Sequence, residues 1–482
     1  MSDPELCYMS ATEALARFRD RSLSPVELTA AVIDRAEAVA ATVNPFGDRY
    51  FDQAMTRARA AEAKYGRPGG RPRRLEGIPL AVKASSAVRG QRAANGSLIN
   101  QDNIDGDTEP AIERLLRSGA NLFARTTCPE FCWLFTTHSR IWGVTRNPWR
   151  LDVTPGGSSG GSAAALAAGA ATIATGGDST GSIRQPASQC GVVGYKPPYG
   201  RIPLTAGASF DPYVQGGPMT RTVADAALMT SIMAGPHPLD HTSLARKLTL
   251  PAEPPGIAGL RIAVSFDLGH YQVIDDVRRE TRAALDALAD AGAEIAEVDL
   301  GDLGETIRLA HGAQEFMSAG AITEAVEKHG DLVSDYVPEL ARTAQSFTAE
   351  DYRRGLALAG TIWRDRLGPV LRDHDAFICP TVSCPEVPAE NWQQTEVMIN
   401  GHSLTDTDTA MTALFNMFSR CPVLAVPSGM TDGGLPTGIQ IVGRPLDDPT
   451  VFRIARALER QRPWLDALAR RPSPAAMMAP PA

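Results

Sequence analysis

Serine and glycine residues that could carry out chemistry are concentrated between residues 154 and 203 of this 482-residue chain. The stretch reads TPGGSSGGSAAALAAGAATIATGGDSTGSIRQPASQCGVVGYKPPYGRIP, so two glycine–serine clusters flank an alanine-rich segment. A serine hydroxyl is a weak nucleophile and attacks a carbonyl only when an adjacent base activates it. The clusters therefore indicate nucleophilic catalysis or the cradling of an anion, provided that the chain folds the two loops together.

Local propensity suggests how the two clusters meet. Alanine is the strongest helix former, so we expect a helix over Ser162–Ala171 that Ser162 caps, followed by a strand over Ala171–Thr175. The helix has only about three turns, so the strand runs back and brings the second loop beside the first. Ser158 and Ser182, which are 24 positions apart in the sequence (182 minus 158), could then meet.

Two general patterns compete for these glycines. A phosphate-binding loop needs G-x-x-x-x-G-K-[ST], but after Gly156 and Gly161 the chain has Ser162 where the lysine should stand. A nucleophile elbow, G-x-S-x-G, is matched at residues 157–161 and 177–181, although short matches arise easily in a chain with 43 glycines. An elbow also needs a histidine, and the candidates have no distinctive context: His237, His241, His270, His311, His329, His374 and His402.

A longer pattern gives a third interpretation. The run T-P-G-G-S-S-G-G-S, followed by D-x-x-G-S-I-R-x-P-A-x-x-C-G-V-V-G-x-K-P-x-x-G-R, resembles the signature of the amidase signature family of serine hydrolases. The resemblance extends from about Leu23 to Glu459, almost the whole chain. Its further segments are Gly77–Lys83 (GIPLAVK), Arg146–Trp149 (RNPW), Gly217–Met219 (GPM) and Leu435–Pro445 (LPTGIQIVGRP).

The resemblance implies an α/β amidase signature fold, in which helices flank both faces of a central, mixed and twisted β-sheet. It also implies hydrolysis of a carboxylic amide through a covalent acyl-serine intermediate. Position by position, Ser182 corresponds to the nucleophile, Ser158 to a relay serine on a cis peptide bond, and Lys83 to the terminal base. The resemblance implies no metal and no organic cofactor, and the partner it implies is a small-molecule amide.

The resemblance also assigns the loop around the nucleophile. The backbone amides of Ser179, Thr180, Gly181 and Ser182 correspond to the oxyanion hole, and Asp178 and Arg184 to groups that brace the loop. The family usually has glycine where Thr180 stands. The β-branched side chain of Thr180 is expected to narrow the pocket. The family also usually follows the lysine with aspartate and asparagine, where this chain has Ala84-Ser85. Without that carboxylate beside it, the lysine is more easily neutral, as a base must be. The alternative is that the substitution reflects a different packing of the loop.

Aromatic and apolar residues indicate the nature of the substrate pocket. In the family the loop over Cys128–Phe135 lines the pocket, so Phe131, Trp133, Leu134 and Phe135 are candidate substrate contacts. Phe210 and Tyr213 lie in the irregular stretch Leu204–Gln215, which we expect over the pocket mouth. An apolar acyl group is the substrate that these residues favour. The alternative is that the rings pack into the core behind the loop.

Two other functions are open to a chain with this sequence. One is the glutaminase subunit of a tRNA-dependent amidotransferase, which would need a polar pocket the size of glutamine and a partner subunit. The other is a catalytically silent binding protein on the same fold, which we would expect to lack at least one of Lys83, Ser158 and Ser182; the chain has all three.

Composition bounds the cellular context. The formal net charge is -8 and there is no basic run, so nucleic acid is not an expected partner. The start MSDPELCYMS lacks a basic start and an apolar run, and no apolar stretch reaches the ~20 residues that span a bilayer, so we expect a soluble, cytoplasmic protein and no membrane partner. The seven cysteines favour reduced thiols, and no metal-ligand spacing is present. A homodimer is one assembly open to it.

We expect one domain over residues 1–471, with a signature core over about 77–220 and a helical region covering the pocket over about 303–375. Residues 10–65 are predicted to form two amphipathic helices, the second opened by a capping box at Ser24. A strand–helix–strand unit over 260–298 indicates parallel pairing in the same sheet. Residues 422–445 predict a hairpin, and residues 472–482 predict a disordered tail.

Overall fold

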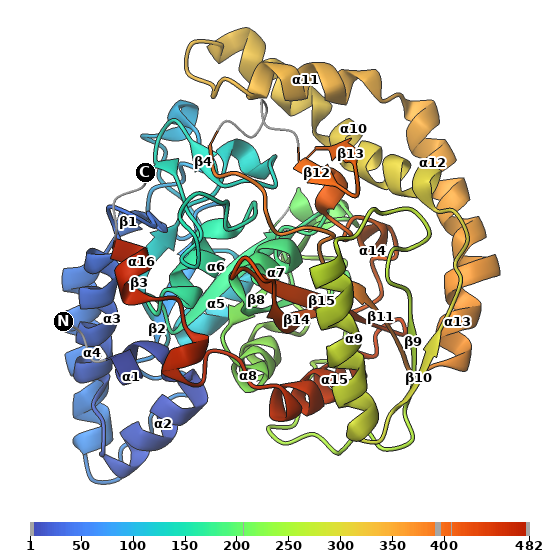
Figure 1. Ribbon diagram of the computed structural model, residues 1–482. Coiled ribbons are helices and arrows are strands. Elements are labelled where there is room, and N and C mark those ends of the chain that lie inside the picture. The colour runs from blue at the N-terminus through green and yellow to red at the C-terminus, as the bar shows by residue number, and fades with distance from the viewer. Residues whose placement is uncertain (1–3, 206, 391–396, 406, 479–482) are drawn as a thin grey trace.

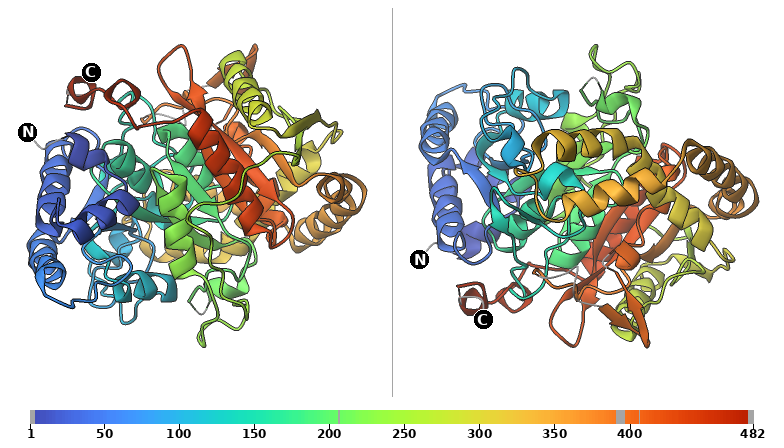
Figure 2. Two further views of the ribbon diagram at one scale, coloured as in Figure 1. Left: turned by 90° about the horizontal axis from the view of Figure 1, so that it is seen from below. Right: turned by 90° about the horizontal axis from the view of Figure 1, so that it is seen from above.

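A computed structural model describes residues 4–205, 207–390, 397–405 and 407–478. Its main feature is a twisted sheet that runs through the middle of the molecule with helices on both faces (Figures 1 and 2). The expected α/β class is therefore confirmed. In the part of the chain described, no helix has both the length and the apolar character needed to cross a bilayer.

Eleven strands of the described residues form this sheet, and their order differs from their sequence order. The strands β2, β3 and β6 run parallel to one another, as do β9, β10 and β11, while the pairs between these groups are antiparallel, so the sheet is mixed. In spatial order the strands are β1 (Phe46–Arg49), β3 (Asn121–Thr126), β2 (Pro79–Lys83), β6 (Ile173–Asp178), β8 (Gln215–Thr220), β7 (Val193–Lys196), β14 (Val423–Met430), β15 (Pro436–Gly443), β11 (Ala376–Pro380), β9 (Arg261–Val264) and β10 (Glu294–Glu297).

Two small hairpins lie outside the sheet, β4 (His138–Ser139) with β5 (Gly143–Val144) and β12 (Val397–Ile399) with β13 (His402–Leu404). The helices are α1 (Pro4–Tyr8), α2 (Ala11–Asp20), α3 (Pro25–Ala38), α4 (Phe51–Gly66), α5 (Pro110–Arg117), α6 (Gly160–Ala167), α7 (Arg184–Cys190), α8 (Val223–Met233), α9 (Asp275–Asp290), α10 (Gly304–His329), α11 (Val337–Ser346), α12 (Ala349–Ile362), α13 (Gly368–Asp373), α14 (Leu414–Met417), α15 (Asp448–Gln461) and α16 (Pro474–Met478).

Strand periodicity divides the core into layers on the two faces of the sheet. On β11, Ala376 and Ile378 join a buried cluster with residues of α8, α9 and α15. Phe377 and Cys379 point to the other face and join a cluster with residues of α10, α13 and α14. Because successive strand residues face opposite sides, an unbroken apolar strand such as β11 requires cover on both faces.

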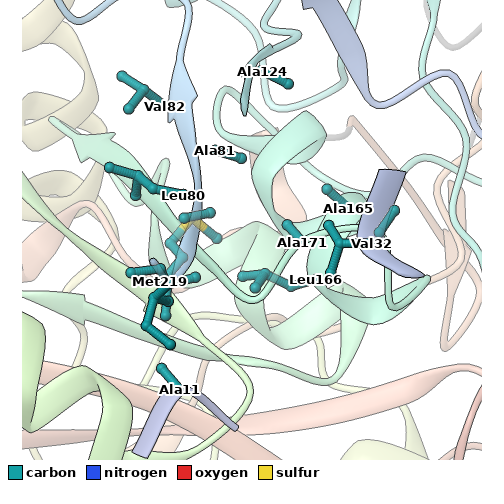
Figure 3. Close-up of a cluster of buried hydrophobic side chains, with 14 of the residues drawn as sticks. Ala11, Val32, Leu80, Ala81, Val82, Ala124, Ala165, Leu166, Ala171 and Met219 are labelled. Carbon is teal, nitrogen blue, oxygen red and sulfur yellow. The ribbon is translucent and has the colours of Figure 1, made fainter. Parts of the chain in front are cut away.

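The alanine-rich helix α6 brings the serine-rich loops close to the sheet. Its apolar side chains, including Ala165 and Leu166, lie in one buried cluster with Leu80 and Ala81 of β2 (Figure 3). The helix begins at Gly160, two residues earlier than expected, and Ser162 does not cap it. The Ser162 hydroxyl instead donates to the Thr175 carbonyl at 2.8 Å and shares a hydrogen bond with Thr126 Oγ1 at 2.7 Å, so it joins α6 to β3 and β6.

Two expectations near the chain ends are wrong in part. Residues 10–65 contain three helices rather than two. Strand β1, which pairs with β3, lies in the sequence between the second and third of them. The tail is also partly ordered, because residues 474–478 form α16, Met477 is fully buried, and its carbonyl accepts a hydrogen bond from Thr42 Oγ1. Residues 479–482 of the expected tail lie outside the described residues. The capping box at Ser24 is confirmed, with Glu27 Oε2 accepting from the Ser24 amide at 2.8 Å.

The second half of the chain follows the expected pattern more closely. Strands β9 and β10 are parallel neighbours in the same sheet, and β14 and β15 form the predicted hairpin. Residues 303–375 are largely helical, and α10 packs against α11, α12 and α14. Helices α10 and α11 lie at the top of the molecule in Figure 1, and α12 and α13 run down its right side; in the view from above in Figure 2, the α10–α11 region crosses the molecule.

Candidate functional site

Three neighbouring parallel strands end at the same edge of the sheet. Lys83 is the last residue of β2, the loop Cys128–Phe135 follows β3, and the loop Ser179–Ser182 follows β6. Parallel strands carry their carboxyl ends to one edge, where α/β proteins usually place their ligands. The segments that the sequence analysis singled out therefore meet because the topology brings them there.

Lys83 and Ser158 are in direct contact. Lys83 Nζ lies 2.7 Å from Ser158 Oγ and donates to it, although the two residues are 75 positions apart in sequence. Lys83 is 2% exposed and Ser158 is 1% exposed, so water barely reaches the pair. The peptide bond between Gly157 and Ser158 is cis. A β-carbon on Gly157 would lie 2.6 Å from the Leu134 carbonyl oxygen, so only glycine fits there.

A cavity of about 480 Å³ joins Lys83 and Ser158 to the second serine loop. Ser179, Thr180 and Ser182 line it, and Ser182 is 4% exposed. The Ser182 carbonyl accepts a hydrogen bond at 3.1 Å from the amide of Ser159, which fixes the two serine loops relative to each other. The structure therefore brings Ser158 and Ser182 to one cavity, as the sequence predicted.

The loop over Ser179–Ser182 is held in an unusual conformation. Gly181 has a φ of +133°, and a β-carbon there would lie 1.9 Å from Thr412 Oγ1, so any other residue would displace the loop. The Thr412 hydroxyl donates to the Thr180 carbonyl at 2.5 Å. Within the described residues, none of the four amide groups from Ser179 to Ser182 donates a hydrogen bond. Three of these residues, Ser179, Thr180 and Ser182, line the cavity, so backbone amides without a protein partner lie at its wall.

A buried ion pair supports this loop from behind. Arg184 donates to both carboxylate oxygens of Asp178 at 3.0 Å, and both side chains are fully buried. The carboxylate also accepts from the backbone amides of Ile183 at 3.2 Å and Arg184 at 3.4 Å, and from Asn416 Nδ2 at 2.9 Å. Burial alone would raise the pKa of Asp178, but the guanidinium and these hydrogen bonds hold it below its usual value. The carboxylate therefore stays charged.

Arg184 extends the same network across the sheet. Its Nη1 donates to the Thr412 carbonyl at 3.0 Å and to Gln440 Oε1, on β15, at 2.8 Å, and its Nη2 donates to Asn416 Oδ1 at 2.6 Å. A buried guanidinium is tolerated only when its donors are used in this way.

The aromatic loop after β3 forms one wall of the cavity. Phe131, Trp133, Leu134 and Phe135 all line it, and Leu134 also joins a buried cluster with residues of α10 and α11. The two alternatives of the sequence analysis, pocket wall and core packing, therefore both apply to Leu134.

The structure does not bring Phe210 or Tyr213 to the cavity. Phe210 is 69% exposed and contacts His241, with ring centroids 4.5 Å apart and the ring planes tilted by 32°. Tyr213 is 3% exposed, and its carbonyl accepts a hydrogen bond from Asn416 at 3.1 Å. Their neighbours Leu204, Thr205, Ala208 and Val214 line the cavity instead. An irregular segment has no periodicity from which the inward side chains could be chosen.

Sequence reasoning also missed two groups next to Lys83. The fully buried Arg125, on β3, donates to the carbonyls of Lys83 and Ala84 at 3.4 Å and to the Ser86 carbonyl, so it supports the turn in which Ala84-Ser85 replaces the usual acidic and amide pair. Cys132 lines the cavity. A hydrogen bond with Cys128 and the nearby charge of Lys83 lower the pKa of Cys132, although its burial acts in the opposite direction.

A third missed group is a polar face of α10. His311, Gln314, Glu315 and Ser318 all line the cavity, and their spacing of three and four residues puts them on one side of the helix. We call these four residues the α10 polar face. Burial lowers the pKa of His311 to about 4 and raises the pKa of Glu315 to about 7. Among the described residues, no group of three or more histidine, cysteine, aspartate or glutamate side chains could hold a metal ion.

Comparison with known proteins gives the family. The family model described as Amidase matches residues 27–452. The chain belongs to the amidase family. Such enzymes hydrolyse carbon–nitrogen bonds in linear amides, and this chain is therefore an amide hydrolase with an amidase signature fold.

Individual relatives cover nearly the whole chain. An acylamidase of Rhodococcus erythropolis is 34% identical over 474 residues, which is 97% of this chain and 98% of that protein. A glutamyl-tRNA(Gln) amidotransferase subunit from Anaeromyxobacter sp. (strain K) is 32% identical over 96% of this chain and 98% of that protein. The solved structure of a bacterial aryl acylamidase of the amidase signature family superposes with a TM-score of 0.88 at 26% identity, covering 98% of this chain and 99% of that one.

Proposed function

We propose that the protein hydrolyses amides by forming an ester between the acyl group of the substrate and Ser182, with Ser158 and Lys83 moving the proton. The observation that carries this proposal is the 2.7 Å contact between Lys83 Nζ and Ser158 Oγ in the cavity that Ser182 also lines. When Lys83 is neutral, Nζ accepts the Ser158 proton across this contact, and Ser158 in turn accepts the proton of Ser182.

The remaining steps follow from the two loops. Ser182 Oγ attacks the carbonyl carbon, and negative charge develops on the carbonyl oxygen, where the unpaired amides of Ser179–Ser182 would donate to it. The proton held by Lys83 returns through Ser158 to the leaving nitrogen as the C–N bond breaks. Water then attacks the ester by the same route, and the products are a carboxylic acid and an amine. The pair of Asp178 and Arg184 positions the loop and touches no reacting atom.

For the substrate, we propose an amide with an aromatic or branched acyl group. Phe131, Trp133, Leu134 and Phe135 give the cavity an apolar wall, and each methylene buried there is worth roughly 1 to 3 kcal/mol. The names of an acylamidase and an aryl acylamidase among the similar proteins support the hydrolysis of an acyl amide, while the choice of acyl group rests on the apolar wall. A series of acetamide, butyramide, hexanamide and benzamide should therefore show kcat/KM rising with acyl size, while a flat series would contradict an apolar acyl site.

The nucleophile can be identified directly. A fluorophosphonate should label Ser182, and peptide mapping by mass spectrometry should find the adduct on the peptide that contains it. Ser179→Ala should be labelled as fast as the unchanged protein, whereas Ser182→Ala should not be labelled. An adduct on Ser179 would replace this mechanism with the alternative elbow around that residue.

The similarity to amidotransferase subunits keeps glutaminase activity as a second candidate. Glutamine as the best substrate of the same panel, together with ammonia transfer in the presence of a partner subunit, would favour it. The absence of turnover and of labelling would leave only the non-catalytic alternative.

A further inference from the structure

The cavity has two walls of different chemistry. The apolar wall comes from the loop after β3, with Ile322, Leu340 and Ala344 adding to it from α10 and α11. The α10 polar face (His311, Gln314, Glu315 and Ser318) lines the cavity as well. A substrate that needs only an apolar acyl site would leave this second wall without a role.

Two acceptor oxygens on the polar face have no hydrogen-bond partner among the described residues, Glu315 Oε2 and Gln314 Oε1. Both oxygens are inaccessible to solvent. A buried acceptor without a donor is unfavourable, and such groups in native proteins usually have a functional reason. A rotation of either side chain about its terminal bond would turn its oxygen into the cavity, where a donor from a bound substrate would satisfy it.

The cationic side chains around α10 are engaged with other partners. Arg354, on α12, pairs with Glu305, and Arg342, on α11, pairs with Glu339. Arg308 lies over the ring of Phe347 at 5.9 Å from its centroid. None of these arginines lines the cavity within the described part of the chain. The nearby helices therefore leave the carboxylate of Glu315 for a ligand.

The other ionisable groups that line the cavity do not compete for this role. His311 is neutral at physiological pH because burial lowers its pKa to about 4, and its ring meets Phe135 edge-on. Asp178 is paired with Arg184, and Glu109 is hydrogen-bonded to Ser86. Lys83 contacts Ser158. Glu315 is thus the carboxylate in the cavity without such a partner among the described residues, and burial raises its pKa to about 7.

We propose that Glu315 and Gln314 select amides that carry a basic, hydrogen-bond-donating nitrogen remote from the scissile bond. The apolar wall would hold the body of the substrate, and an ammonium group at its far end would pair with Glu315. An opposite charge at hydrogen-bond distance favours the charged carboxylate, so the substrate itself ionises the group that binds it. This inference rests on the proposed amide hydrolysis at Ser182.

The test compares substrates that differ only in the remote group. One pair varies the acyl side, 4-(aminomethyl)benzamide against 4-ethylbenzamide. The other varies the amine side, N-[4-(aminomethyl)phenyl]acetamide against N-(4-ethylphenyl)acetamide. We expect kcat/KM for the ammonium compound to exceed that for the ethyl compound by about 10- to 100-fold in one pair, the range of a charge-assisted hydrogen bond. The pair that shows the preference identifies the side of the scissile bond that faces α10.

The variant Glu315→Gln should lower this ratio to about one, mainly through a higher KM for the ammonium compound. Because the ratio is taken within one preparation, a partly unfolded variant does not change it. Glu324→Gln is the matched control, since Glu324 lies on the same helix, is exposed and pairs with Lys328 at 2.5 Å. It should keep the ratio of the unchanged protein.

The two proposals fail in different ways. If neither pair shows a preference, or if Glu315→Gln keeps it, the role of Glu315 is wrong even though the ethyl compounds are hydrolysed. If no amide is hydrolysed and Ser182 is not labelled by the fluorophosphonate, the proposed function is wrong, and the role of Glu315 falls with it.

Discussion

Replacing Glu315 by glutamine should stabilise the empty protein at alkaline pH. Burial raises the pKa of this carboxyl from 4.5 to about 7, so the folded protein keeps a proton that the unfolded chain releases between these two values. Stability is therefore lost as pH rises through this window, and below about pH 4.5 both states are protonated and the loss disappears. A difference of about 2.5 pKa units corresponds to about 3 kcal/mol above pH 7. Glutamine has a similar shape and does not titrate.

The assay is thermal unfolding of both proteins between pH 5 and pH 8.5. A chain of 482 residues has an unfolding entropy of about 1 kcal/mol/K, so about 3 kcal/mol is a shift of about 3 °C. We expect the Tm of Glu315→Gln relative to the unchanged protein to rise by about that amount from pH 5 to pH 8.5. Glu324→Gln should show no such pH dependence, and scan rates must match in case unfolding is irreversible. A Tm difference that is constant across this range would refute the reasoning, because it would mean that Glu315 titrates normally.

Three further predictions concern the reactive groups. Lys83→Met should keep the fold but lower kcat/KM for benzamide by about 100- to 10,000-fold, the usual contribution of a general base, and steady-state kinetics with a melting curve would check both. Gly181→Ala should lower kcat by about 100-fold because its β-carbon would meet Thr412, whereas Gly207→Ala, also at positive φ but with open space around it, should not. Iodoacetamide should inactivate the enzyme through Cys132 in the cavity, more slowly in the presence of substrate, and Cys132→Ala should resist it; equal inactivation of both proteins would show that another thiol reacts.

Local patterns in the sequence predicted the elements that local forces determine. The capping box at Ser24 and the hairpin of β14 and β15 each have a complete signal in their own residues. The strand β1 has no such signal, because FGDR is short and half polar and becomes a strand only by pairing with β3. Ser162 has the propensity of a cap, yet its hydroxyl bonds Thr126 and Thr175, which are distant in sequence.

The candidate site likewise contains residues that the sequence could identify and residues that only the structure shows. The resemblance supplied Lys83, Ser158 and Ser182, and the fold brings them to one cavity, while their catalytic roles remain predictions, as do the cytoplasmic location and the homodimer. The α10 polar face has the correct helical spacing in the sequence. It could not be identified there, because polar residues at that spacing usually face solvent. Only the packing of α10 over the cavity shows that they line it and are partly buried.

The position of the reactive loop depends on both halves of the sheet. Asp178 ends β6 and holds the amides that follow Ser182, whereas Arg184 reaches Gln440 on β15 and the Thr412 carbonyl. Replacing a buried ion pair by apolar residues often leaves the free energy of unfolding unchanged. Stability alone therefore does not explain why charged residues, Asp178 and Arg184, occupy these buried positions. The network has a geometric consequence that apolar residues could not reproduce: directed hydrogen bonds fix the loop in the conformation that leaves its four amides free. The same loop then faces the apolar wall and the α10 polar face together, so the position of the attacking serine and the choice of substrate depend on one set of buried contacts.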